Sequence, residues 1–136
     1  MRRRTARPAP RDRGAAAVEF ALLLPMLLLL VFGIIDFGRA LNAQITLTQA
    51  AREGARLDAL GRSNVAAGTQ AAATGLSPVS VTVVTSCLPN ATGDATVKAS
   101  YVFNFVTPLA AISSMFGSSF GSSITLTATG VMPCET

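Results

Sequence analysis

The chain has 136 residues, 50% of them hydrophobic, with 11 Lys or Arg, 7 Asp or Glu and no His. This length leaves room for one small globular domain. The formal charge of +4 would suit a nucleic-acid binder if it were spread over the chain. Residues 1–14, however, hold six Arg against one Asp, whereas residues 15–136 hold five basic and six acidic side chains. Because no aromatic platform or second basic patch accompanies the basic arm, nucleic-acid binding is not expected.

An apolar stretch at residues 15–35 follows the basic arm and contains a single charge, Glu19. In a helix this stretch would be about 31 Å long, which is enough to cross the hydrocarbon core of a bilayer. The basic arm before it is typical of the cytoplasmic side, so the chain after residue 35 is expected outside the cytoplasm. Pro25 should bend the helix.

A cleaved secretory signal is the competing interpretation of the same stretch. The segment Gly38-Arg39-Ala40 offers small residues where a signal peptidase could cut. Against this, the apolar stretch exceeds the usual ~7–15 residues, and the helical pattern continues past the candidate site. A single membrane-spanning helix is therefore the preferred prediction.

Glu19 is costly in lipid, by roughly 2.5–3.5 kcal/mol near the bilayer centre and less near the interface, so it needs a partner or a purpose. If a peptidase cut after the small residue Gly14, the new α-amino group of Ala15 would lie one helical turn from the Glu19 carboxylate, on its own helix or a neighbour's. The two charges could then pair. Alternatively, the helix dipole stabilises Glu19, and its side chain reaches headgroup water.

Three segments resemble the TadE-like family, the pilin-like minor components (minor pilins or pseudopilins) of the tight adherence (Flp) pilus. They are the run RDRGAAAVEFALLLP at 11–25, DFGRA at 36–40 and AREGAR at 51–56. The resemblance implies cleavage by a prepilin peptidase between Gly14 and Ala15, with Glu19 and Phe20 serving subunit assembly. It also implies a bacterial inner membrane location, entry into the pilus remaining open, with other pilin or pseudopilin subunits and the assembly machinery as partners.

Beyond the span the helix is predicted to continue to about Gly61. Small and apolar residues repeat with 3,4 spacing, which marks one buried face: Gly33, Asp36, Ala40, Ala43, Leu47, Ala50, Gly54, Leu57 and Gly61. Charged residues lie largely off this face, and Asp58 and Arg62 have the spacing of an i, i+4 pair. We expect a solvated charged face, with a partner contact through Arg52, Glu53 and Arg56 as the alternative.

The C-terminal part predicts a short helix within residues 63–75, ended by Gly75 to Pro78. A period of two then predicts three strands, at Val79–Thr85, Ala95–Phe105 and Ser123–Thr129. Pro89–Asp94 has the composition of a turn and Thr107–Gly121 that of a longer connection. The expected fold class is α+β: a long N-terminal transmembrane helix that continues into a small domain with a roughly three-stranded antiparallel sheet, which resembles a type IV pilin.

The two cysteines, Cys87 and Cys134, follow the first and third strands, so an up-down-up sheet places both at one end. A disulfide is expected in an exported domain. Metal binding is not, because the chain has neither His nor a Cys-x-x-Cys spacing. With one Lys and one Tyr besides, the usual catalytic bases are nearly absent, and we expect no enzyme activity, no cofactor and no small-molecule substrate.

The predicted organisation is a basic cytoplasmic leader at 1–14, a transmembrane helix at 15–35, its continuation outside the membrane at 36–61 and a small extracytoplasmic α+β domain at 62–136. The function expected from the resemblance is that of a minor pilin or pseudopilin, cleaved after Gly14, that helps to initiate, assemble or anchor a pilus. The alternative is an uncleaved single-pass anchor whose outer domain is a scaffold or binds a partner. A secreted soluble domain is a weaker third option.

Overall fold

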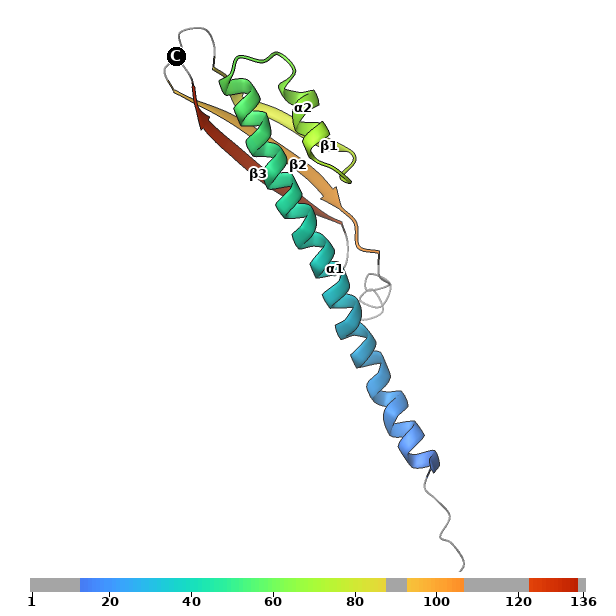
Figure 1. Cartoon of the computed structure of the whole chain (residues 1–136). Coiled ribbons are helices and arrows are strands. Elements are labelled where there is room, and N and C mark those ends of the chain that lie inside the picture. The colour runs from blue at the N-terminus through green and yellow to red at the C-terminus, as the bar shows by residue number, and fades with distance from the viewer. Residues whose placement is uncertain (1–12, 88–92, 107–122, 135–136) are drawn as a thin grey trace, which may run out of the picture.

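The structure is a computed structural model, and it describes residues 13–87, 93–106 and 123–134. Most of the predicted leader, residues 89–92 of the predicted turn Pro89–Asp94 and the connection Thr107–Gly121 lie outside these residues. The chain consists of one long helix, one short helix and three strands, in the order α1, α2, β1, β2, β3 (Figure 1). This is the predicted α+β layout.

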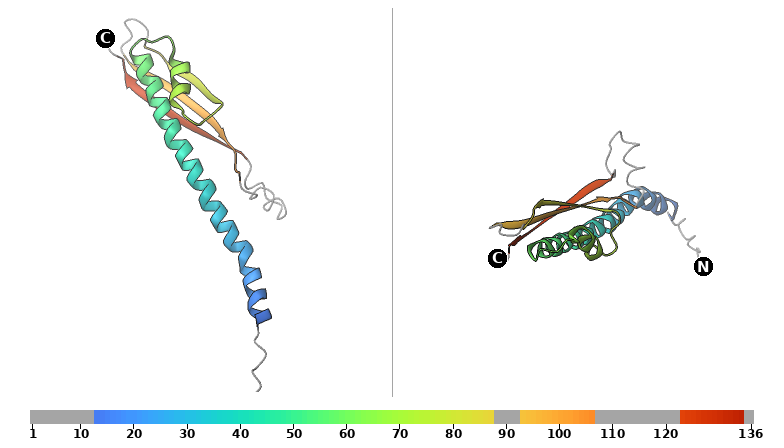
Figure 2. Two further views of the ribbon diagram at one scale, coloured as in Figure 1. Left: turned by 45° about the vertical axis from the view of Figure 1, so that its right-hand side comes forward. Right: turned by 90° about the horizontal axis from the view of Figure 1, so that it is seen from above.

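Helix α1 runs from Arg13 to Ala59 and includes Pro25. Its N-terminal half extends away from the domain, and its C-terminal half lies along the sheet (Figures 1 and 2). Two residues after the end of the helix, Gly61 adopts the left-handed conformation, with φ of 66°. The N–H of Gly61 donates to Asp58 O at 2.9 Å and that of Arg62 to Leu57 O at 2.9 Å, so both hydrogen bonds of a Schellman cap are present.

The three strands form one antiparallel sheet in the order β1-β2-β3. Strand β1, Val79–Thr85, matches the predicted bounds; β2 is Asp94–Phe103, and β3 is Ile124–Pro133. Strand β2 therefore stops two residues before its predicted end, whereas β3 continues four residues beyond its own predicted end. Short helix α2, Val65–Ala72, lies within the predicted range and packs against both α1 and β1.

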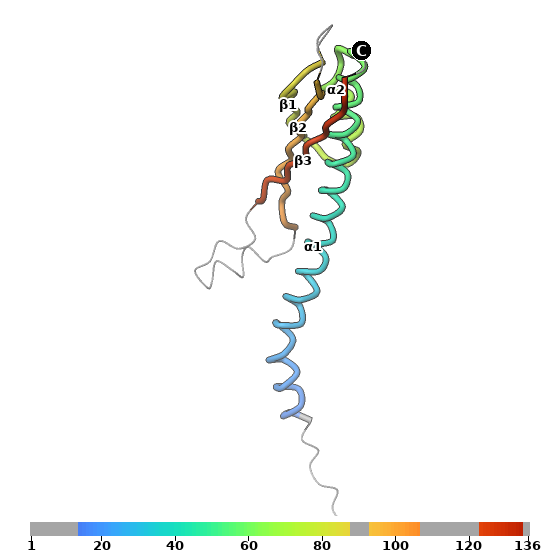
Figure 3. The backbone as a smooth tube through the Cα atoms, turned by 90° about the vertical axis from the view of Figure 1, so that its left-hand side faces the viewer, coloured from blue at the N-terminus to red at the C-terminus, as the bar shows by residue number. Residues whose placement is uncertain are grey.

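The core lies between α1 and one face of the sheet. Figure 3 shows these two layers side by side. From the helix, Leu47, Ala50 and Ala51 are fully buried, and so are Val97 and Ala99 on β2. The side chains on α1 are small, which lets the two layers approach closely. The buried face includes most of the predicted stripe, so the 3,4 periodicity identified the correct side of the helix.

Two glycines, Gly54 and Gly130, lie where α1 closely approaches other elements of the domain. A Cβ atom built on Gly54 of α1 would overlap the Thr69 hydroxyl of α2 and lie 3.0 Å from Val97 Cγ1. A Cβ atom on Gly130 of β3 would lie 2.7 Å from the backbone nitrogen of Arg52 and closer still to the carbonyl of Ala51. Both positions need glycine for space rather than for backbone conformation, since neither has a positive φ.

Candidate functional site

The predicted processing site lies at the start of α1. Gly14 and Ala15 are the second and third residues of the helix, and both are exposed. Nothing lies within 4 Å of the position that a Cβ atom on Gly14 would occupy. The peptide bond between them is thus open to an enzyme, although it belongs to the first helical turn. Terminal turns fray readily, and a peptidase that binds an extended segment would have to unwind this one.

Glu19 and Phe20 lie one to two turns further along, on the part of α1 that no other described element covers. Both are exposed, Phe20 to 62%. Glu19 makes no hydrogen bond or ion pair with any other residue that the structure describes. Ala15 and Glu19 share a helix face, as their i, i+4 spacing requires. The carboxylate therefore belongs to a part of the helix that lies outside the domain.

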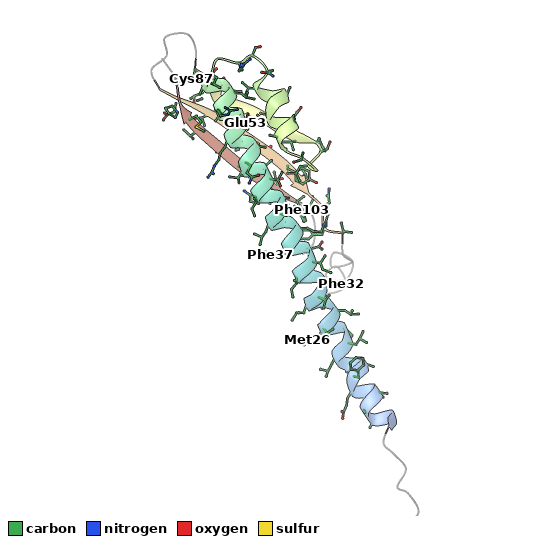
Figure 4. The ribbon with its side chains drawn as sticks, viewed as in Figure 1. Met26, Phe32, Phe37, Glu53, Cys87 and Phe103 are labelled. Atoms are coloured by element: carbon green, nitrogen blue, oxygen red, sulfur yellow. A yellow bond between two sulfur atoms is a disulfide. The ribbon has the colours of Figure 1, made fainter. Side chains whose placement is uncertain are left out.

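The helix from which Glu19 projects is the one described helix that is long and apolar enough to cross a membrane. Its most apolar window has a mean hydropathy of 2.7, and none of that window is buried within the chain. Leu22 and Met26 are more than 70% exposed, and Figure 4 labels Met26 on this part of the helix. A helix with apolar side chains all round and no cover fits a single-pass membrane protein.

An apolar stripe continues along α1 beyond the predicted span. Ile34, Phe37, Leu41 and Ile45 are spaced by three or four residues and are 65%, 66%, 50% and 59% exposed. By helical periodicity they lie roughly opposite the buried Ala43 and Leu47. We refer to these four residues as the outer stripe. Sequence reasoning concentrated on the buried face and missed this second one, although its spacing was readable.

The predicted partner contact of Arg52, Glu53 and Arg56 lies on the exposed side of α1. Arg56 donates from Nε to Glu53 Oε2 at 3.0 Å and from Nη2 to Glu53 Oε1 at 3.2 Å. These hydrogen bonds are the main reason why the pKa of Glu53 is lowered and that of Arg56 raised. Arg52 is exposed and makes no hydrogen bond or ion pair within the described chain. Of the three, Arg52 is therefore the one whose charge is free for a partner.

The predicted pairing of Asp58 with Arg62 is wrong. Asp58 is 6% exposed, and its two carboxylate oxygens accept hydrogen bonds from Ser86 Oγ at 2.8 Å and from Cys87 N at 3.0 Å. Neither ion pair in the described part of the chain involves Arg62. Asp58 instead fixes the end of α1 to the segment after β1, so it belongs to the buried face and not to the solvated one.

Cys87 and Cys134 form the expected disulfide, with their Cα atoms 5.6 Å apart. The bridge joins the segment after β1 to the segment after β3 at the end of the sheet away from the span, where Figure 4 labels Cys87. Asp58 accepts from the backbone of one of its cysteines. The C-terminal end of α1, the segment after β1 and the disulfide are thus connected to one another.

Asp36 occupies the opposite end of the domain, where α1 first meets the sheet. It is 1% exposed, and its Oδ1 accepts from Arg39 Nη1 at 3.2 Å and from the backbone N of Val106 at 3.4 Å. The Arg39 guanidinium also lies 5.2 Å from the centroid of the Phe103 ring. Sequence reasoning placed Asp36 on the buried stripe but assigned it no partner, because Val106 is 70 residues away.

The cavities of the described chain are shallow and do not suggest a binding site. One shallow groove of about 220 Å³ is lined by Arg56, Ala59, Leu60, Met132, Pro133 and Cys134. Another of about 450 Å³ lies beside the loop from Ala73 to Val79. Within the described residues no three His, Cys, Asp or Glu side chains come together as metal ligands would.

These features define a class: an α+β protein with one exposed apolar N-terminal helix, a carboxylate near its start and a small disulfide-linked sheet on its outer half. Residues 14–56 match the sequence model of the family described as TadE-like protein, which confirms the predicted resemblance. The matched segment contains Gly14, Glu19 and the Arg52–Arg56 segment, and it ends within α1. Neither the curated proteins nor the solved structures give a match to this chain.

Proposed function

We propose that this chain is a minor pilin or pseudopilin of a tight adherence pilus system, cleaved after Gly14 by a prepilin peptidase. Support comes from the match of residues 14–56 to TadE-like proteins together with the position of Glu19. That carboxylate projects from an uncovered apolar helix and has no partner among the described residues. A charge in such a place calls for a partner from another molecule.

In this proposal the α-amino group of Ala15 on one subunit pairs with Glu19 on its neighbour. The pair sets the axial register between two helices, because any other register leaves a charge uncompensated in an apolar environment. The outer stripe extends the same helix–helix contact from the end of the span outward, where Leu41 and Ile45 are otherwise exposed. Arg52 supplies a charged contact to the next component of the assembly.

The proposed organisation follows from these roles. Residues 1–14 are the leader on the cytoplasmic side of the bacterial inner membrane, residues 15–35 span it, residues 36–61 continue the helix outside and residues 62–136 complete the outer domain. The chain acts as a structural subunit rather than an enzyme. Its partners are the peptidase, other pilin or pseudopilin subunits and the assembly machinery.

The second candidate is an uncleaved membrane anchor with an outer scaffold domain. The helical conformation of Gly14 and Ala15 favours it, since a helical peptide bond is a poor peptidase substrate until it unwinds. The two candidates differ in what Glu19 does. An anchor needs no carboxylate there, whereas a subunit held by an Ala15–Glu19 pair does.

The test is a Glu19→Gln variant expressed in the native host, with Asp94→Asn, at an exposed carboxylate of the outer domain, as the control. We expect Glu19→Gln to reach the membrane at the normal level but to lose co-purification with the other pilus components. Asp94→Asn should retain it. If Glu19→Gln co-purifies as well as the unaltered chain, the carboxylate has no role in assembly and the anchor interpretation is preferred.

A further inference from the structure

The end of the sheet nearer to the span lies level with the outer end of the predicted membrane helix. The evidence is the contact between Asp36 Oδ1 and Val106 N, 3.4 Å apart, because Asp36 follows the last residue of the span directly. One residue along a helix is about 1.5 Å. The domain is therefore not raised above the membrane on a length of bare helix, and the chain after β2 arrives at the membrane surface itself.

Apolar side chains are exposed at this level. Val106 is 74% exposed, Phe37 on α1 is 66% exposed, and Ile124, which begins β3, is 41% exposed. Ile124 pairs with Phe103, whose ring lies 5.2 Å from the Arg39 guanidinium, so β3 begins about one helical turn beyond Asp36. Figure 4 shows Phe37 and Phe103 near the end of the domain where the N-terminal half of α1 leaves it, and Cys87 at the opposite end of the domain. We refer to Phe37, Val106 and Ile124 as the seat.

The charges around the seat also suit a membrane surface. The carboxylate at this level, Asp36, is buried and paired with Arg39. Within the described segments 33–45, 101–106 and 123–127 no acidic side chain is exposed. The Arg39 side chain is 45% exposed, and its cation can reach lipid phosphates while its stem stays apolar. Aromatic and apolar side chains with a nearby Arg are the composition that proteins place at the bilayer interface.

We propose that the domain rests on the outer leaflet of the membrane, with the seat inserted at the headgroup and upper acyl-chain level. The inference rests on the proposed membrane span of residues 15–35 but adds a second, peripheral contact with lipid. It makes the orientation of the domain relative to the bilayer fixed rather than free. A subunit leaving the membrane for an assembly would then have to release the seat as well as the span.

A fluorescence experiment tests this, because the chain contains no Trp and one can be placed at will. Val106→Trp reports on the seat, and Val84→Trp is the matched control. Val84 is 58% exposed and lies two residues before Ser86, whose hydroxyl donates to Asp58. On α1, Asp58 lies roughly 30 Å beyond Asp36, so Val84 is far from the seat. Leu27→Trp reports on the span. Each full-length variant is reconstituted in phospholipid vesicles with and without acyl-chain bromination.

We expect Val106→Trp to emit at shorter wavelength than Val84→Trp and to lose fluorescence when the acyl chains carry bromine near the headgroup. Val84→Trp should emit equally in both kinds of vesicle. Phe37→Trp, a conservative aromatic exchange, should behave as Val106→Trp does and guards against misfolding of the first variant.

The proposal is overturned if Val106→Trp and Phe37→Trp both emit as Val84→Trp does. Quenching of Leu27→Trp in that experiment would show that the span is inserted. Only the proposed contact of the seat with lipid would then be contradicted, and not the proposed membrane span. If bromine deep in the acyl chains does not quench Leu27→Trp either, residues 15–35 do not span the bilayer. The proposed contact of the seat with lipid is then contradicted as well.

Discussion

The main chain of Ala51 in α1 lies directly against Gly130 in β3, so closely that a methyl group on Gly130 would overlap the Ala51 carbonyl. Backbone atoms of a helix cannot move aside as a flexible side chain can. The small residues on this face of α1 therefore have a definite use: they bring the helix onto the sheet at main-chain contact distance.

Gly130→Ala should destabilise the domain by about 1–3 kcal/mol or more, because the added methyl group forces helix and strand apart. Gly93→Ala is the control, since a Cβ atom on Gly93 meets nothing within 4 Å. Denaturant unfolding of the detergent-solubilised chain measures both. Equal stability of the two variants would show that α1 and β3 are not in main-chain contact.

Asp58→Asn should cost about 1–2 kcal/mol, because a neutral amide makes weaker hydrogen bonds with Ser86 Oγ and Cys87 N than a carboxylate does. Asp94→Asn, at an exposed residue, removes the same charge as a control. The midpoint of urea unfolding distinguishes them. A loss of stability in Asp94→Asn as large as in Asp58→Asn would point to net charge instead of the buried contacts.

Replacing both cysteines by Ser should lower the stability by about 4 kcal/mol on the chain-entropy model, because the bridge closes a loop with a sequence separation of 47. Treatment of the unaltered domain with a reductant should produce the same shift in thermal unfolding. The double variant should not respond to reductant. A response there would mean that the reductant acts on something other than this disulfide.

The Glu53–Arg56 pair predicts a small pH effect. Hydrogen bonds from Arg56 lower the pKa of Glu53 below its ordinary 4.5. A carboxyl with a lowered folded-state pKa contributes stability above its unfolded pKa and loses that contribution as the pH falls through the folded value. The unaltered chain should therefore melt slightly above Glu53→Gln at neutral pH, and the gap should close in acid. A gap that widens in acid would contradict this sign.

The local elements followed from the sequence because their signals are local. Alternation gave β1 its bounds, and 3,4 spacing gave the buried face of α1. The end of β3 was predicted too early, since Gly130 interrupts the pattern; yet the strand continues, because residues 131–133 still pair with residues 94–96. A glycine that admits a helix is not distinguishable, in sequence alone, from one that ends a strand.

The long-range contacts could not be predicted in this way. Asp58 has a plausible local partner in Arg62, four residues on, whereas its actual partners are 28 and 29 residues away. Asp36 similarly contacts Val106, which lies 70 residues further along the sequence. Burial of these carboxylates depends on where the sheet docks, and helix periodicity carries no information on that. The disulfide was accessible because strand order alone brings its two cysteines to one end.

The measurement that tests the proposed function most directly is the intact mass and N-terminal sequence of the protein recovered from membranes of its native host. The proposed function predicts a mature chain that begins at Ala15 and has Glu19 as its fifth residue. The same start should be found for Glu19→Gln, whose failure then lies in assembly and not in processing. A chain that begins at Met1, or that keeps Arg11 and Arg13, would contradict the account and leave an uncleaved membrane anchor.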